Sequence, residues 1–291
     1  MKKYIIAIIP FILPFYSYSQ QIYKGRVLDS LSKKPLYLIN VSYIKKDIGT
    51  YTDAEGFFEI KKDTTDYLFI SSVGYKEKKI SINKYNNVPI LLSEKVEELE
   101  EVYISNKKIK YSEVKLVGLK KKLKVRTTLP FGYEFSNLII NPYKKKGVIK
   151  TVILDLNKSK KYDYLATYNI KFYNYDPIKK QPGELIYYRN IIINPKNKTY
   201  KLKIDVESLK IDFPENGVCI GVEIVNSKYD EPIKNMAIIA PKINFTHTKD
   251  FDILTWSRYR NKKWKERTRK SRVKKEYING SINLEVRIEK K

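Results

Sequence analysis

The densest group of side chains able to recognise a ligand lies near the C-terminus, where both tryptophans of the chain stand among arginines and lysines. Arginine and lysine pair with phosphate or carboxylate oxygens, while indole and phenol rings stack on sugar rings or cover apolar acyl surface. A hairpin with residues 261–263 at its tip would present the two tryptophans from opposing strands. The candidate ligand-binding residues are Trp256, Arg258, Tyr259, Arg260, Trp264, Arg267, Arg269 and Arg272.

The same segment has a purely structural interpretation. The tryptophans could pack inward as part of the core, and the basic residues could form a solvated strand edge, which natural sheets use to block edge-to-edge aggregation. Both interpretations stay open from the sequence.

The chain contains one histidine and one cysteine, which limits the catalytic and metal-binding sites that these residues could form. His247 has Asp250 as its only nearby carboxylate, so a Ser–His–Asp arrangement would have to assemble from distant segments. Cys219, flanked by Val218 and Ile220, lacks the electropositive setting that produces a thiolate and is expected to be a small core residue. A zinc site cannot be assembled from this inventory. We expect no metal and no other cofactor.

Paired carboxylates could hydrolyse a glycosidic bond, since such enzymes place two acidic side chains on either side of it. The strand-borne candidates are Glu184, Glu207, Glu223 and Asp252. Their spacing in the sequence singles out no two of them. We therefore assign no catalytic residue, and a carbohydrate-active hydrolase remains the alternative function.

The N-terminus has the pattern of a secretory signal peptide. Lys2 and Lys3 precede an apolar run, Ile5–Phe15, that is too short to cross a bilayer. Ser17 and Ser19 flank Tyr18 in the small-x-small pattern that a signal peptidase accepts. We expect residues 1–19 to be removed. Because no cysteine stands at this junction, the mature protein is expected to be soluble and without a lipid tail, with no transmembrane segment.

The formal net charge of +26 would attract phosphates, anionic glycans or membrane surfaces. The abundance of Lys, Ile, Asn and Tyr together also fits plain compositional bias, so the charge alone selects no partner. Export argues against nucleic acid. An anionic glycan, lipopolysaccharide or peptidoglycan is the expected class of ligand.

Hydrophobic periodicity in the mature chain has a period of two residues, which predicts an all-β protein. Seven short strands are expected in a first domain, residues 20–93, followed by a charged linker, 94–124. The acidic and basic blocks of this linker could also fold against each other as a short helix and strand. Eight or nine longer strands are expected in residues 125–291, as in a second, larger jelly-roll-like β-sandwich. The expected strands are 22–28, 36–44, 50–52, 57–60, 67–71, 76–82 and 88–92, then 148–156, 164–175, 185–193, 200–206, 218–225, 236–239, 253–259 and 282–288.

Several motifs punctuate the first domain. They are Gly25–Asp29 at the first strand, Pro35-Leu36 with Val41, Gly49–Ile60, and Ser72–Tyr75. Asp53 can fold its carboxylate onto the turn amides, Gly56 can take a positive φ, and Phe57 or Phe58 can resume the buried face. Gly74 and Tyr75 predict a tight bend and an aromatic lid over the sandwich end.

With these motifs, residues 24–92 resemble the carboxypeptidase regulatory-like family. The resemblance implies a seven-stranded, transthyretin-like sandwich of the kind common in secreted and outer-membrane proteins of the Bacteroidetes, without the zinc chemistry of carboxypeptidases. Residues 96–104 are similar to the segment that follows this domain in TonB-dependent receptors. About 170 residues remain after it, too few for a plug and a 22-stranded barrel.

Together these features predict an exported cell-envelope protein, periplasmic or associated with the outer membrane or cell surface, that binds or scaffolds and does not catalyse. A further alternative is an accessory subunit of an outer-membrane TonB-dependent receptor, which would use Glu100–Ile104 to add a strand to an outer-membrane protein partner.

Overall fold

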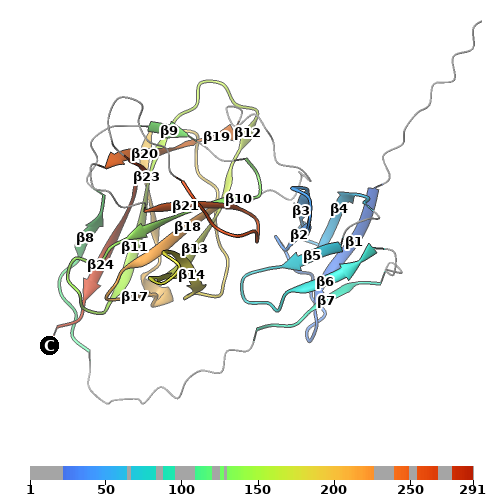
Figure 1. Cartoon of the computed structure of the whole chain (residues 1–291), viewed down its shortest axis with the longest axis horizontal. Coiled ribbons are helices and arrows are strands. Elements are labelled where there is room, and N and C mark those ends of the chain that lie inside the picture. The colour runs from blue at the N-terminus through green and yellow to red at the C-terminus, as the bar shows by residue number, and fades with distance from the viewer. Residues whose placement is uncertain are drawn as a thin grey trace, which may run out of the picture.

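The computed structural model describes residues 22–63, 67–82, 88–95, 109–119, 125–127, 130–225, 239–248, 254–267 and 277–290. Within these ranges the chain folds into two β-rich domains side by side (Figure 1). The expected all-β class is confirmed, since none of the described residues forms an α-helix. No described helix is long and apolar enough to cross a membrane. The expected signal peptide, residues 1–19, lies outside the described residues.

The N-terminal domain is a sandwich of two sheets that enclose a core of alternating apolar residues. All seven strands expected from the sequence are present. The three-stranded sheet has the order β4 (Phe57–Lys61), β1 (Ile22–Asp29), β7 (Ile90–Leu92). The four-stranded sheet has the order β3 (Gly49–Tyr51), β2 (Asn40–Tyr43), β5 (Tyr67–Ser71), β6 (Lys78–Ser81).

The turn between β3 and β4 has the chemistry that its residues predict. Asp53 Oδ1 accepts hydrogen bonds from the backbone N–H of Glu55 at 3.1 Å and of Phe57 at 2.8 Å. Gly56 has φ = +78°, a value that residues with a side chain rarely adopt. Phe58 is buried and Phe57 is half exposed, so Phe58 is the residue of the pair whose side chain packs into the core.

The C-terminal domain is a larger sandwich, as expected. Its first sheet has the order β14 (Gln181–Leu185), β13 (Thr167–Asp176), β18 (Val218–Val225), β10 (Tyr133–Ile139), β21 (Thr255–Tyr259), β22 (Lys265–Glu266), with β15 (Ile191–Ile193) also paired to β13. Its second sheet has the order β23 (Tyr277–Gly280), β20 (Lys242–Thr248), β11 (Gly147–Asn157), β24 (Ile282–Ile288), β8 (Lys115–Gly118).

Short elements complete this domain. Strands β16 (Tyr200–Asp205) and β17 (Asp212–Phe213) pair with β11, and β9 (Val125–Thr127) pairs with β20. A parallel pair joins β12 (Tyr164–Leu165) to β19 (Ile239–Ala240), and a 3₁₀ turn, η2, covers Glu207–Leu209.

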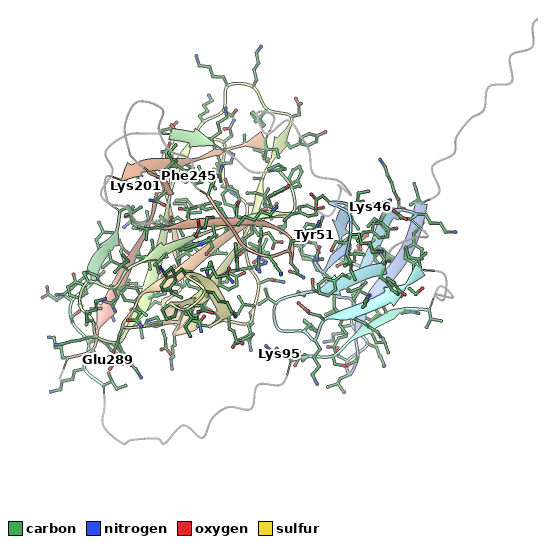
Figure 2. The ribbon with its side chains drawn as sticks, in the orientation of Figure 1. Lys46, Tyr51, Lys95, Lys201, Phe245 and Glu289 are labelled. Carbon is green, nitrogen blue, oxygen red and sulfur yellow. The ribbon has the colours of Figure 1, made fainter. Side chains whose placement is uncertain are left out.

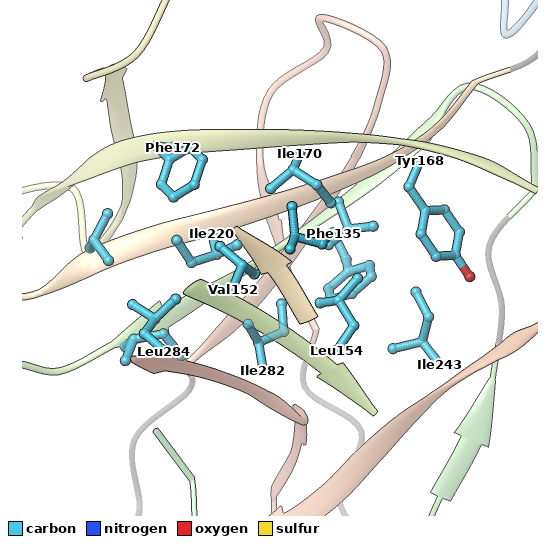
Figure 3. Packing of buried hydrophobic residues seen from close by; sticks show 14 of the residues in the cluster. Phe135, Val152, Leu154, Tyr168, Ile170, Phe172, Ile220, Ile243, Ile282 and Leu284 are labelled. Carbon is cyan, nitrogen blue, oxygen red and sulfur yellow. The ribbon is translucent and has the colours of Figure 1, made fainter. Parts of the chain in front are cut away.

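Apolar side chains from the two sheets meet between them and fill the domain (Figure 3). Phe135 and Ile220 come from the first sheet, and Leu154, Ile282 and Leu284 come from the second. The first sheet presents only every second residue of β13 and β18 to this core, because strand side chains alternate between faces. Its opposite face therefore carries the remaining residues.

The expected linker at 94–124 is only partly a connector. Strand β8 pairs with β24 from Lys115↔Val286 to Gly118↔Asn283, and Tyr111 forms a bridge with Glu289. Residues 109–119 thus belong to the C-terminal sandwich, whereas residues 96–108 lie outside the described residues. Several paired strands were not expected from the sequence, among them β10 and β20.

Removing the Asp53 carboxylate should destabilise the turn between β3 and β4. Asp53→Ala should lower the free energy of unfolding by about 1–2 kcal/mol, because two backbone amides lose their acceptor. Asp53→Asn keeps an acceptor oxygen and should lose clearly less. Urea unfolding of the three proteins measures the difference, and equal stability of the alanine and asparagine variants would contradict this role of the carboxylate.

Candidate functional site at the domain junction

Polar side chains form a row across the first sheet of the C-terminal domain, on the face turned away from its core. The strand registers place Asn169 beside Glu223, Glu223 beside Glu134, and Glu134 beside Arg258. Residues directly opposite on neighbouring antiparallel strands have Cβ atoms about 4.5–5.5 Å apart. The four side chains are therefore brought together by the pairing of β13, β18, β10 and β21.

Lys171 lies one row further along the same face and joins the two carboxylates. Its Nζ is 2.9 Å from Glu223 Oε2 and 3.5 Å from Glu134 Oε2. Arg258 holds Glu134 Oε2 with Nε at 3.1 Å and Nη2 at 2.9 Å, and Tyr173 Oη donates to Glu134 Oε1 at 2.8 Å. We call Glu134, Lys171, Glu223 and Arg258 the charge network.

Mutual pairing shifts the pKa values of three members of the charge network, Lys171, Glu223 and Arg258, towards the charged forms, against the effect of burial. Burial disfavours the ammonium of Lys171, but the carboxylates of Glu134 and Glu223 outweigh it and raise its pKa above the ordinary value. Burial likewise disfavours the carboxylate of Glu223, yet Lys171 holds the Glu223 pKa below its usual range. Burial also acts against Arg258, whose pKa is nonetheless raised by Glu134. The arrangement is a set of fixed charges.

A glycine makes room for this arrangement. A Cβ at Gly221 would clash with the carboxylate of Glu134 and lie 2.9 Å from the ring of Tyr173. The small residue on β18 thus lets the Glu134 side chain lie flat over the sheet and reach both of its cationic partners.

The N-terminal domain covers this face. Tyr51, at the end of β3, lies at the junction of the two domains (Figure 2), where its hydroxyl donates to Glu223 Oε1 at 2.7 Å. Around it, Leu38 of the N-terminal domain packs with Val225 and the partly buried Ile192 of the C-terminal domain. The junction therefore combines a small apolar cluster with a direct hydrogen bond to the charge network.

Arg260 crosses from the C-terminal domain into the N-terminal one. The residue is 3% exposed, and its guanidinium donates to the Asn40 side-chain oxygen and, at 2.9 Å, to the Thr50 carbonyl oxygen. The guanidinium also lies over the Tyr51 ring, 4.3 Å from its centroid. A Cβ at Gly49 would collide with this guanidinium. Arg260 thus inserts a buried charge from the C-terminal domain into the N-terminal one, and we call it the interdomain peg.

Two hollows lie at the junction of the two domains. The first, which we call the interdomain cavity, has a volume of about 240 Å³ and is lined by residues of both domains, including Lys171, Glu223 and Arg258. The second, the lysine groove, is about 600 Å³ and runs between β2, β5 and the turn that follows β21. Asn261 lines both hollows.

The lysine groove has an apolar lining with cations along one side. Tyr43, Ile44 and Phe69 contribute from the N-terminal domain. Three lysines of the β21–β22 hairpin contribute from the other side: Lys262, Lys263 and Lys265. Lys262 also forms an ion pair with Asp47 across the junction. Such a groove suits a ligand that has both an apolar or ring surface and negative charge.

The hairpin expected around the basic segment is present, and its aromatic side chains are buried or partly buried. Trp256 is 2% exposed, Tyr259 is buried, and Trp264 packs edge-on against Tyr173 at a centroid distance of 5.7 Å. Trp256 is buried, as the structural alternative supposed, but it packs with Leu138, Tyr173, Cys219 and Leu254 on the outer face of the first sheet and not in the core between the sheets.

The arginines of the segment divide into three groups. Arg258 is in the charge network and Arg260 is the interdomain peg, so both serve internal contacts. Arg267 lies with its guanidinium 4.8 Å from the centroid of the Phe245 ring. Arg269 and Arg272 lie outside the described residues, and their role stays a prediction.

The other residues considered for chemistry are scattered. Glu184 is exposed on β14, Glu207 pairs with Lys150 and Arg287, and Asp252 lies outside the described residues. Of the three carboxylates that the structure describes, Glu223 alone lines the interdomain cavity.

Cys219 is buried, as expected, and burial raises the pKa of its thiol to about 12. His247 is in β20, where it pairs with Ile278. Among the residues that the structure describes, no three His, Cys, Asp or Glu side chains gather as a metal site would require.

Sequence reasoning missed Glu134, Lys171 and Tyr51. A faint signal exists: Glu134, Lys171 and Glu223 each sit between two apolar or aromatic neighbours in a strand. That pattern is the same for a solvated sheet face, so it does not reveal that a second domain would cover these charges.

Comparison with known proteins identifies one part of the chain. Residues 23–104 match the CarboxypepD_reg-like domain family, which confirms the resemblance in the N-terminal part. Searches of curated proteins and of solved structures found no match. The match includes Asn40 and Tyr51 but none of the charge network.

Removing the peg should loosen the junction. Arg260→Ala deletes a buried charge with partners in the other domain, a change that costs about 2–5 kcal/mol. We expect the single thermal transition of a docked pair to separate into two by calorimetry. Arg287→Ala, which removes an exposed ion pair with Glu207, is the matched control and should cost less than about 1 kcal/mol. Unchanged unfolding of the Arg260 variant would exclude the peg role.

Acid should weaken the junction through Glu223. Because its pKa is lowered in the folded state, the stabilisation it provides is complete above the ordinary value of 4.5 and is lost as the pH falls through the folded-state value. The melting temperature of the wild type should drop more steeply below pH 4.5 than that of Glu223→Gln. Parallel melting curves for both proteins between pH 7 and pH 3 would contradict this assignment.

Proposed function

We propose that this chain, whose N-terminal part is a CarboxypepD_reg-like domain, is an exported binding and scaffolding protein of the bacterial cell envelope. Its ligand is an anionic glycan or envelope polymer such as lipopolysaccharide or peptidoglycan. The lysine groove is the observation that carries this proposal. Export rests on the leader-like pattern of residues 1–19.

The chemistry of the groove supports an amphipathic anionic ligand. The partly exposed Ile44 and Phe69 offer apolar contact, while Lys263 and Lys265 are exposed on the other side. Lysine acts as a point charge towards phosphate and carboxylate groups, and apolar side chains can cover a sugar ring or an acyl chain. An excess of basic residues over the whole chain adds long-range attraction for such polymers.

The docking of the two domains supports a scaffold. The groove exists only where the N-terminal sheet meets the β21–β22 hairpin, so ligand recognition depends on a fixed placement of one domain against the other. Arg260 and Tyr51 provide that placement through buried contacts. A rigid two-domain unit suits a protein that holds a polymer in place.

Binding is favoured over hydrolysis by the state of the carboxylates. Glu134 and Glu223 are neighbours, but each accepts hydrogen bonds from two or more groups and both contact Lys171. A glycosidase needs one carboxyl group that stays protonated to act as the acid, whereas the pKa of Glu223 is lowered. The segment that would recruit an outer-membrane receptor, residues 100–104, lies outside the described residues.

Charge reversal in the groove tests the proposal. The triple variant Lys262→Glu, Lys263→Glu, Lys265→Glu should lose retention on lipopolysaccharide and peptidoglycan at physiological salt by about tenfold or more, as expected when several cations that contact an anionic polymer are reversed. The matched control reverses three exposed lysines in the loop between β10 and β11: Lys144, Lys145 and Lys146. Equal loss in both triple variants would mean that net charge, not the groove, governs retention.

A further inference from the structure

The interdomain cavity is lined by polar groups whose charges nearly cancel. Lys171 and Arg258 bring two positive charges, while Glu223 and Glu77 bring two negative ones. Six amide or hydroxyl side chains complete much of the lining: Asn40, Ser71, Ser72, Asn169, Asn190 and Asn261. A lining of this kind is rich in hydrogen-bond donors and acceptors and has no net charge.

These groups are already held in place by bonds to each other. Asn169 Nδ2 donates to Asn190 Oδ1 at 2.9 Å, and Asn40 Nδ2 donates to Ser71 Oγ at 2.9 Å. Lys171 carries three ammonium protons for its two carboxylate partners, and the amide nitrogen of Asn190 carries two donors. A site whose side chains are fixed before the ligand arrives loses little conformational entropy on binding.

Size and charge limit what this cavity can accept. Its volume of about 240 Å³ lies just below the range of about 300–1,000 Å³ typical of small-molecule sites, so one ring fits and a longer chain does not. An anion would meet Glu223 and Glu77, and a cation would meet Lys171 and Arg258. A neutral molecule bearing several hydroxyl groups can instead bond to donors and acceptors on every side.

The cavity and the lysine groove adjoin each other, because Asn261 lines both. The side chain of Asn261 donates to Ser71 Oγ of the N-terminal domain, so the shared wall is itself an interdomain contact. A polymer lying in the groove is therefore separated from the polar interdomain cavity by one residue, Asn261.

We infer that the interdomain cavity binds one neutral sugar residue of the anionic glycan whose charged part lies along the lysine groove. This inference rests on the proposed function and specifies the ligand further. The cavity supplies recognition of hydroxyl groups, and the groove supplies attraction for charge.

The test uses the full chain and two kinds of probe. Saturation-transfer NMR with glucose, galactose, mannose and N-acetylglucosamine monitors the cavity, and retention on lipopolysaccharide and peptidoglycan monitors the groove. Ser72→Leu fills the cavity from the N-terminal domain, and Asn190→Ala removes an amide from the C-terminal side. Ser93→Leu, at an exposed serine of the same domain, is the matched control.

We expect saturable binding of at least one of the sugars to the wild type, weakened about tenfold or more in Ser72→Leu and in Asn190→Ala, as when a site built to hydrogen-bond hydroxyls loses a partner. Ser93→Leu should bind the same sugar within about twofold of the wild type, since it does not alter the cavity lining.

Two results would overturn the inference: no saturable binding of any of the four sugars, or equal binding by the wild type, Ser72→Leu and Asn190→Ala. Retention on the polymers in either case would leave the proposed function standing. Sugar binding without polymer retention would instead reject the groove.

Discussion

The junction depends on a lysine held between two carboxylates on a sheet face. Charges such as Lys171, Glu134 and Glu223 are expensive to remove from water unless they are paired and hydrogen-bonded, and burial here is nearly complete. The N-terminal domain completes that requirement, because Tyr51 donates to Glu223 and excludes solvent from the row. Docking of the two domains therefore also completes the hydrogen bonding of the buried charges.

Sequence periodicity predicted most of the N-terminal fold, because that domain is organised by local rules. Short apolar and β-branched runs between turn residues mark its seven strands, and Asp53 and Gly56 mark a turn whose hydrogen bonds and φ value follow from their chemistry. The family match over residues 23–104 is consistent with such a locally determined domain. Cys219 was also placed correctly, since apolar neighbours on a strand indicate a core position.

The candidate site could not be predicted in the same way, because it is made by contacts distant in sequence. Tyr51 reaches Glu223 across 172 positions, and Arg260 reaches Thr50 across 210. Alternation gives the face on which a residue lies, but it cannot distinguish a face covered by another domain from one open to water. The basic hairpin was found from its composition, whereas the burial of Trp256, Tyr259 and Arg260 depends on what lies over them.

The position of Asn261 between two hollows has a thermodynamic consequence. Any molecule that occupies either hollow touches both domains at once, so it has a higher affinity for the docked arrangement than for separated domains. By reciprocity, whatever strengthens docking raises the affinity for that molecule by the same factor. The equilibrium between docked and separated domains then contributes to the apparent binding constant of such a molecule.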